Sequence, residues 1–97
     1  MPRFIMLANY TDQGIRGVND TSARAQAFRD AGKKMGIDVT DFYWTLGGYD
    51  MVTIMDAPDA ETVTALGLSV GKLGNVRTQT LQAFDPPAME RVMTKVI

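Results

Sequence analysis

Two runs of β-branched and aromatic residues, FYWTL and MVTIM, flank the adjacent glycines Gly47 and Gly48. These runs predict strands over residues 37–46 and 49–56. The glycines predict a tight hairpin turn between them, because two-residue hairpin turns need positive φ. With the turn there, Trp44 lies opposite Met51, and this register divides the hairpin into two faces.

Neither face of the predicted hairpin is polar. One face carries Phe42, Trp44, Leu46, Tyr49, Met51, Thr53 and Met55, and the other carries Tyr43, Val52 and Ile54 with Thr45 and Asp50. The helices of the chain can cover only one face, and a contiguous exposed apolar patch is a liability. We therefore expect a second copy of the sheet to cover the open face, which makes a homodimer or a higher homo-oligomer. The alternative cover is the chain's own C-terminal helix.

Two further segments are predicted to be strands. Residues 3–10 are mostly apolar with bulk on both sides, which is typical of a central strand covered on both faces. Residues 76–84 are polar enough for an edge strand, where Arg77 would guard against mispairing. Between the first strand and the first helix, residues 11–20 predict a loop with one helical turn.

Three segments are predicted to be helices. The first covers residues 20–35 and ends before Gly36. The second starts within residues 56–59, with Pro58 in its first turn, and runs to about Leu73. A short third helix follows Asp85 with the prolines at 86 and 87. The expected apolar stripes are Ala23, Ala27, Phe28, Ala31 and Met35 on the first helix, Ala60, Val63, Leu66, Val70 and Leu73 on the second, and Met89, Val92, Met93 and Val96 on the third.

The predicted order is β-α-β-β-α-β followed by a C-terminal helix. Two right-handed crossovers around a hairpin give an α+β, ferredoxin-like fold: a four-stranded antiparallel sheet with both helices on one face. The length of 97 residues, with 45% hydrophobic and 22% charged residues, suits one globular domain over residues 1–97.

Composition restricts the chemistry that is available. The chain has no cysteine and no histidine, so thiolate nucleophiles, cysteine-ligated metals and the usual general base are excluded. A net charge of −1 gives no reason to expect nucleic acid or a membrane surface as a partner. The first residues, MPRFIML, lack the long apolar core of a signal peptide, and no run reaches a membrane span of roughly 20 residues, so we expect a cytoplasmic protein.

Two charged clusters have structural explanations. Arg24, Arg29, Lys33 and Lys34 fit a solvated helix surface better than an anion site. The acids at positions 56, 59 and 61 fit a helix N-terminus, and a calcium loop needs more ligands than these. We therefore predict no metal and no cofactor.

The segment FYWTLGGYD, from Phe42 to Asp50, resembles the defining segment of the GYD-domain family, a bacterial family named for three of these residues. The resemblance extends over residues 5–84 through the segments YTDQG, RAQAF, APD, GNVRT and AF. It implies a ferredoxin-like fold of the dimeric α/β-barrel group, in which two sheets close around a shared interior. The family is functionally uncharacterised, so the resemblance implies no activity.

The candidate pocket residues are Asn9, Tyr10, Tyr43, Trp44, Tyr49 and Asp50. One hypothesis is a non-catalytic module for assembly or small-ligand binding, whose interior holds a small apolar molecule. The alternative follows from related dimeric-barrel families: a cofactor-independent oxygenase acting on an aromatic or phenolic molecule. In the structural interpretation, which turn chemistry alone supports, Gly47 and Gly48 make the turn, Tyr49 packs beside Trp44, and Asp50 bonds Thr45 or nearby backbone. The position of Asn9 and Asp50 distinguishes the hypotheses, since an enzyme needs them in the interior.

Overall fold

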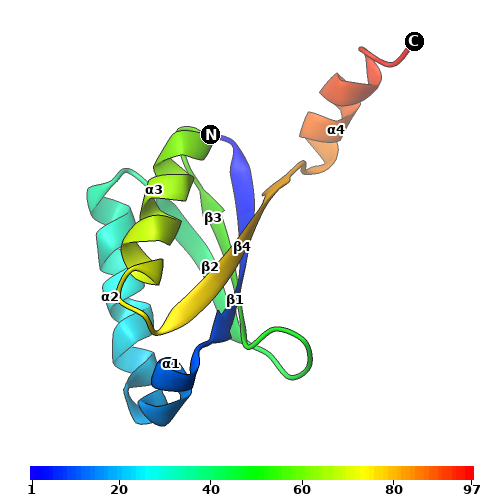
Figure 1. Ribbon diagram of the computed structural model, residues 1–97. Helices are drawn as coiled ribbons and strands as arrows, with labels where there is room; N and C mark the ends of the chain where they lie inside the picture. Colours follow the sequence, from blue (N-terminus) through cyan, green and yellow to red (C-terminus); the bar gives the residue numbers. More distant parts are fainter.

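A four-stranded antiparallel sheet forms the centre of the molecule (Figure 1). In this computed structural model, which describes residues 1–97, the strands are β1 (Arg3–Tyr10), β2 (Asp38–Trp44), β3 (Met51–Asp56) and β4 (Val76–Ala83). Their spatial order is β2-β3-β1-β4, and every neighbouring pair is antiparallel. The predicted ferredoxin-like α+β arrangement is confirmed, with β1 central and β4 at an edge.

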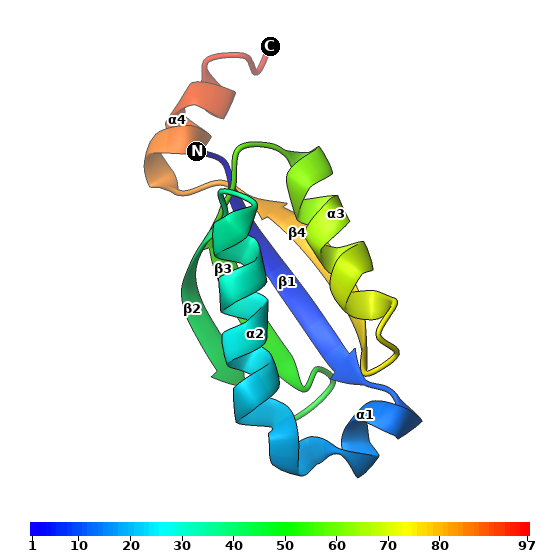
Figure 2. The ribbon, with the colours of Figure 1, turned by 90° about the vertical axis from the view of Figure 1, so that its left-hand side faces the viewer.

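Two helices, α2 (Thr21–Lys34) and α3 (Ala60–Gly71), cover one face of the sheet, and β1 is visible between them (Figure 2). The short helix α1 (Asp12–Arg16) and a 3₁₀ turn (Val18–Asp20) connect β1 to α2. Asp59 begins α3 as its N-cap, since its carboxylate accepts a hydrogen bond from the backbone N–H of Thr62 at 2.8 Å.

The hydrophobic core lies between these helices and the sheet. Its buried members include Phe4, Met6, Phe28, Met55, Val63 and Leu66. The predicted stripe of α3 is confirmed at Val63 and Leu66 and is wrong at its two ends, because Ala60 is exposed and Leu73 lies exposed beyond the end of the helix. On α2 the prediction is partly wrong, because Ala25 is buried while Ala23 and Ala27 are exposed. Phe28 anchors the helix to the core, and the rotation that this anchor imposes brings Ala25 to the sheet.

The predicted hairpin register is confirmed, with Trp44 opposite Met51 and Phe42 opposite Thr53. The predicted two-residue turn is wrong, because the strands end at Trp44 and restart at Met51, and the connecting loop spans residues 45–50. Gly47 has φ of 117°, but Gly48 does not have positive φ. Long-range bonding explains the wider loop: the backbone N–H of Asp50 donates to the carbonyl oxygen of Ala8 in β1 at 2.9 Å.

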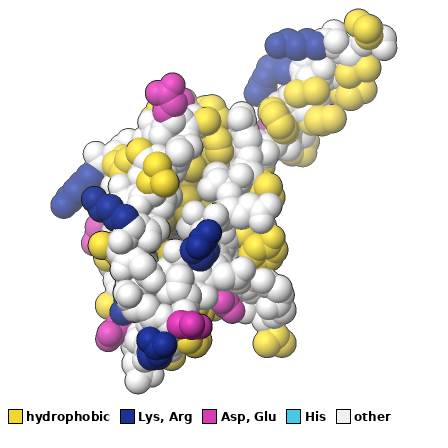
Figure 3. Space-filling model, in the orientation of Figure 1, with side chains coloured by type: hydrophobic (Ala, Val, Ile, Leu, Met, Phe, Trp, Pro, Cys, Tyr) yellow, Lys and Arg dark blue, Asp and Glu magenta, His cyan; other side chains and the backbone are white.

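The C-terminal helix α4 (Pro86–Met93) projects away from the body of the molecule (Figures 1 and 2). Its hydrophobic side chains gather on one side, opposite the basic ones (Figure 3). Met89 and Met93 are 46% and 55% exposed. The alternative in which this helix covers the sheet of its own chain is therefore wrong. None of the helices combines the length and the apolar character needed to cross a membrane.

Candidate functional site

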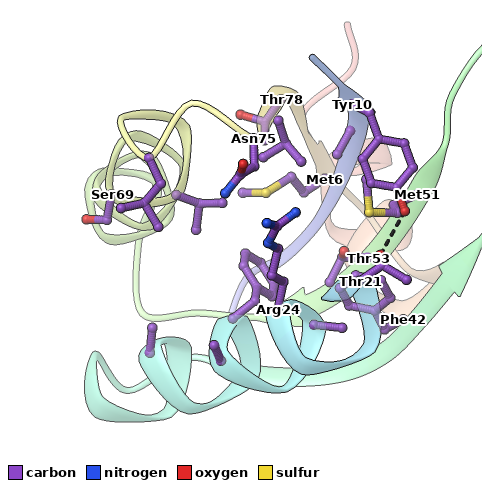
Figure 4. A pocket seen from close by; sticks show the side chains of 18 residues that line it. Met6, Tyr10, Thr21, Arg24, Phe42, Met51, Thr53, Ser69, Asn75 and Thr78 are labelled. Atoms are coloured by element: carbon purple, nitrogen blue, oxygen red, sulfur yellow. Dashed lines mark hydrogen bonds between the residues drawn. The ribbon is translucent and has the colours of Figure 1, made fainter. Parts of the chain in front are cut away.

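The helix side of the sheet contains an apolar cavity of about 340 Å³. It lies between α2 and α3, with β1 and β3 as its floor (Figure 4). The apolar lining residues are Met6, Ala8, Tyr10, Ala25, Ala27, Phe28, Ala31, Phe42, Met51, Val70, Leu73 and Val76, and the polar ones are Thr21, Arg24, Thr53, Ser69, Asn75 and Thr78. The volume is in the range of small-molecule sites, which are mostly apolar with a few placed polar groups.

Thr21, at the start of α2, joins two aromatic residues at the edge of this cavity. Its hydroxyl oxygen lies 2.7 Å from the hydroxyl of Tyr10, a bond drawn as a dashed line in Figure 4. The indole N–H of Trp44 donates to the same oxygen at 2.9 Å. Trp44 also packs on Phe42, with ring centroids 4.9 Å apart. Two predicted site residues, Tyr10 and Trp44, therefore meet at one point although they come from different strands.

Arg24 extends from α2 into the cavity (Figure 4). Its guanidinium donates one hydrogen bond, from Nη1 to the carbonyl oxygen of Gly17 at 3.3 Å. No aspartate or glutamate lines the cavity. The ion pair of the structure, between Arg3 and Asp56, involves neither Arg24 nor the cavity. The lining therefore includes one positive charge and no carboxylate. Arg24 is half-buried, so its position lies between the solvated helix surface that the sequence predicts and the interior.

The side chains of Asn9 and Asp50 fasten the hairpin loop to the end of β1. The Asp50 carboxylate accepts a hydrogen bond from the backbone N–H of Tyr10 at 2.9 Å. The Asn9 amide oxygen accepts one from the backbone N–H of Asp50 at 3.2 Å. The carbonyl oxygen of Asp50 accepts a third, from the backbone N–H of Thr45 at 2.8 Å. Neither Asn9 nor Asp50 lines the cavity.

Tyr49 lies over the open, helix-free face of the sheet. Its hydroxyl donates to the side-chain oxygen of Gln79 at 2.9 Å, and Gln79 pairs with Leu7 on the strand face that the helices do not cover. The prediction that Tyr49 packs beside Trp44 is therefore wrong, because strand alternation stops at Trp44 and the loop places Tyr49 independently. Tyr43 is also on the open face and is 55% exposed.

Apolar side chains from all four strands make up this open face. They are Ile5 and Leu7 of β1, Tyr43 of β2, Val52 and Ile54 of β3, and Leu81 of β4. At one end of the face, Arg3 donates to Asp56 at 3.1 Å. This hydrogen bond, reinforced by the charge of Arg3, holds the pKa of Asp56 below its ordinary value.

The sequence model of the GYD domain matches residues 4–93. This chain belongs to the GYD domain family. A relative of this GYD domain from Thermus thermophilus is 34% identical over 85 residues, which cover 87% of this chain and 90% of the relative. That protein is named glutamine synthetase and cystathionine beta-lyase binding protein. The crystal structure of TTHA0845, also from Thermus thermophilus, is similar, with a TM-score of 0.57, 25% identity, and coverage of 88% of this chain and 95% of that one.

In this GYD domain, the three residues of the family motif have separate positions. Gly48 lies in the open loop, where no atom would contact an added Cβ within 4 Å. Tyr49 reaches the open face, whereas Asp50 holds the end of β1. The six predicted site residues thus fall into three groups: Tyr10 with Trp44 at the cavity, Asn9 with Asp50 at the loop, and Tyr43 with Tyr49 on the open face.

Arg24 is the residue of the GYD domain that sequence reasoning missed. A signal for it exists in the spacing, because Arg24, Ala27, Phe28 and Ala31 are three and four residues apart and so share one helix face. An arginine on an apolar stripe is unusual for a solvated helix surface. The other groups at the mouth, Asn75 and Ser69, come from elements whose relative placement only the fold determines.

Proposed function

We propose that this GYD domain is a non-catalytic assembly module: a homodimer, closed face to face through its sheets, that binds other proteins. The observation that carries the proposal is the open face of the sheet. Its centre, on β1 and β3, is apolar, whereas the edge strands add Asp41, Arg77 and Gln79. Neither α2, α3 nor α4 of the same chain covers this face. An apolar patch with a polar surround on an uncovered face is typical of an interaction site.

A second copy of the sheet is the cover that fits this face best. Face-to-face sheets pack about 10 Å apart and interdigitate the side chains of their inner faces. Leu7 and Val52, which are paired neighbours in the register, lie near the centre of the open face. The Arg3–Asp56 pair and Gln79 supply a polar rim. An apolar centre with a polar rim is the usual anatomy of a protein interface.

The projecting helix α4 supports the protein-binding part of the proposal. Met89 and Met93 are exposed and four residues apart, so they share one face of α4, and the hydrophobic side chains of this helix gather on one side (Figure 3). Amphipathic helices of this kind dock into grooves of partner proteins, and methionine adapts to irregular surfaces. The name of the Thermus thermophilus relative suggests the class of partner. We therefore propose that α4 contacts a metabolic enzyme, with glutamine synthetase and cystathionine β-lyase as the first candidates.

Binding of the immobilised domain to each purified enzyme tests this assignment. We expect saturable binding to at least one of the two, and at least tenfold weaker binding for the double variant Met89→Asp and Met93→Asp. Leu68→Asp is the matched control, since Leu68 is 69% exposed on α3; it should bind as the wild type does. Failure of both enzymes to bind the wild type contradicts the partner assignment.

The alternative, an oxygenase that needs no cofactor, has less support. It requires Asn9 and Asp50 in the interior, whereas both side chains fasten the loop to β1. Oxygen uptake measured with simple phenols tests this alternative. We expect no uptake above that of the buffer, and turnover that Asp50→Ala abolishes would favour the enzyme.

A further inference from the structure

We propose that the cavity between α2, α3 and the sheet is a binding site for a small apolar carboxylic acid, with Arg24 as the counter-ion of the carboxylate. This site lies on the opposite side of the sheet from the proposed dimer interface. It goes beyond the assembly function and does not depend on it.

The size and lining of the cavity argue for a ligand. The cavity opens to solvent beside α2, where Ala27 is exposed, so a small molecule can enter it from the surface. This cavity measures about 340 Å³, whereas an apolar cavity of about 150 Å³ already accepts a small hydrocarbon such as benzene. Met6, Phe28, Met51 and Val70 present mostly carbon and sulfur to it, so water in its depths has few hydrogen-bond partners. Flexible methionines at the floor allow the site to adjust to the shape of a hydrocarbon.

The charge at the mouth specifies the head group of that ligand. The guanidinium of Arg24 has five N–H donors, of which the structure uses one, on the carbonyl oxygen of Gly17. A guanidinium binds a carboxylate through two parallel hydrogen bonds, which suits a single anionic group. A cationic head would be repelled, and a neutral head would leave the charge uncompensated.

A second donor lies at the same mouth. Asn75 lines the cavity (Figure 4). Its amide oxygen accepts a hydrogen bond from Gln13 at 3.0 Å, which leaves its amide nitrogen to donate. The arrangement therefore combines an apolar chamber, one unpaired cation and one amide donor. A hydrocarbon chain or ring that ends in a carboxylate satisfies all three.

The test compares three probes that share one hydrocarbon tail and differ in the head group: octanoate, octan-1-ol and octylammonium. Binding is measured by calorimetry and by chemical-shift changes of backbone amides. We expect one octanoate per chain, at least tenfold weaker binding of octan-1-ol, and no binding of octylammonium in the cavity. The shifted amides should belong to cavity residues such as Ala25 and Val70 and not to the open face around Ile5 and Leu81.

Variants separate the roles of charge and volume. Arg24→Gln should weaken octanoate at least tenfold and leave octan-1-ol unchanged, whereas Ala27→Leu, which fills the cavity, should weaken both. Lys33→Gln removes a charge from an exposed position of the same helix and should bind octanoate as the wild type does. Unchanged melting temperatures before ligand addition show that the variants are folded.

Three results would overturn the proposal. The first is equal binding of octanoate and octylammonium. The second is wild-type affinity of Arg24→Gln for octanoate. The third is absence of octanoate binding together with cavity amide shifts that depend on protein concentration, which would mean that a second copy of the chain fills the cavity.

Discussion

Replacement of Gly14 by alanine tests the close backbone contact between α1, which contains Gly14, and the loop before β4, which contains Asn75. A Cβ on Gly14 would lie 1.9 Å from the backbone oxygen of Asn75 and 2.8 Å from its carbonyl carbon. Non-bonded heavy atoms need about 3.5 Å, so α1 or the loop must move by more than about 1 Å. That movement strains the hydrogen bond from the N–H of Thr11 to the same oxygen, which measures 3.1 Å.

The expected cost follows from three contributions. Overpacking costs about 1–3 kcal/mol, and the weakened hydrogen bond adds about 1 kcal/mol. The better helix propensity of alanine offsets about 1 kcal/mol. Gly14→Ala should therefore lower the free energy of unfolding by about 2 kcal/mol, which corresponds to a melting temperature lower by about 8–16 °C for a domain of this size.

The matched control is Gly71→Ala at the end of α3, where an added Cβ meets nothing within 4 Å. The same substitution should there raise the free energy of unfolding by about 0.5 kcal/mol, because alanine loses less entropy on folding than glycine. Urea denaturation at equal protein concentration measures both values. Changes of the same sign for Gly14→Ala and Gly71→Ala would refute the reasoning about this contact.

Three further predictions concern single side chains. Asp56→Asn should destabilise the domain at neutral pH, because Arg3 lowers the pKa of Asp56 in the folded state. The stabilisation from this ion pair is present above the pKa of Asp56 in the unfolded chain and is lost as pH falls through its lower pKa in the folded state. The unfolding curves of variant and wild type should therefore converge below about pH 4. Leu66→Ala, at a fully buried position, should lower the free energy of unfolding by about 3 kcal/mol in urea denaturation. Leu68→Ala, at a position that is 69% exposed, should change it by less than about 0.5 kcal/mol. Equal changes would contradict the assigned core. Asp50→Ala removes the carboxylate that accepts the hydrogen bond from the backbone N–H of Tyr10, and should lower the free energy of unfolding by about 1.5 kcal/mol. Backbone amides at the end of β1 should also exchange faster. Unchanged exchange would show that the loop does not depend on this carboxylate.

The register of the hairpin could be predicted from the sequence because the loop over residues 45–50, although wider than predicted, is still centred between Gly47 and Gly48. Phe42 and Trp44 are two residues apart, and Met51 lies as far after the Gly47–Gly48 pair as Trp44 lies before it, so the pairing needs no information from elsewhere in the chain. The turn could not be predicted in the same way. Asp50 is bonded to β1, which is forty residues away in sequence, and this contact opens the loop and turns Tyr49 toward Gln79.

The cavity illustrates a second limit of sequence reasoning. Each lining segment has an ordinary pattern, and the space between them depends on how α2 and α3 pack on the sheet, where Phe28 and Leu66 are buried in one core. Arg24 gave a weak signal through its place on the apolar stripe. The open face could be predicted from the sequence. Both faces of the hairpin carry apolar residues, and the helices can cover only one of them, so the other needs a cover.

Sedimentation velocity at micromolar concentration tests most directly whether a second copy of the chain covers the open face. We predict a species of about twice the chain mass of 10.6 kDa. Leu7→Lys, at the centre of the open face, should dissociate it to the monomer, and Leu68→Lys, at an exposed position of α3, should leave it unchanged. A wild-type protein that sediments as a stable monomer across this concentration range would contradict this prediction.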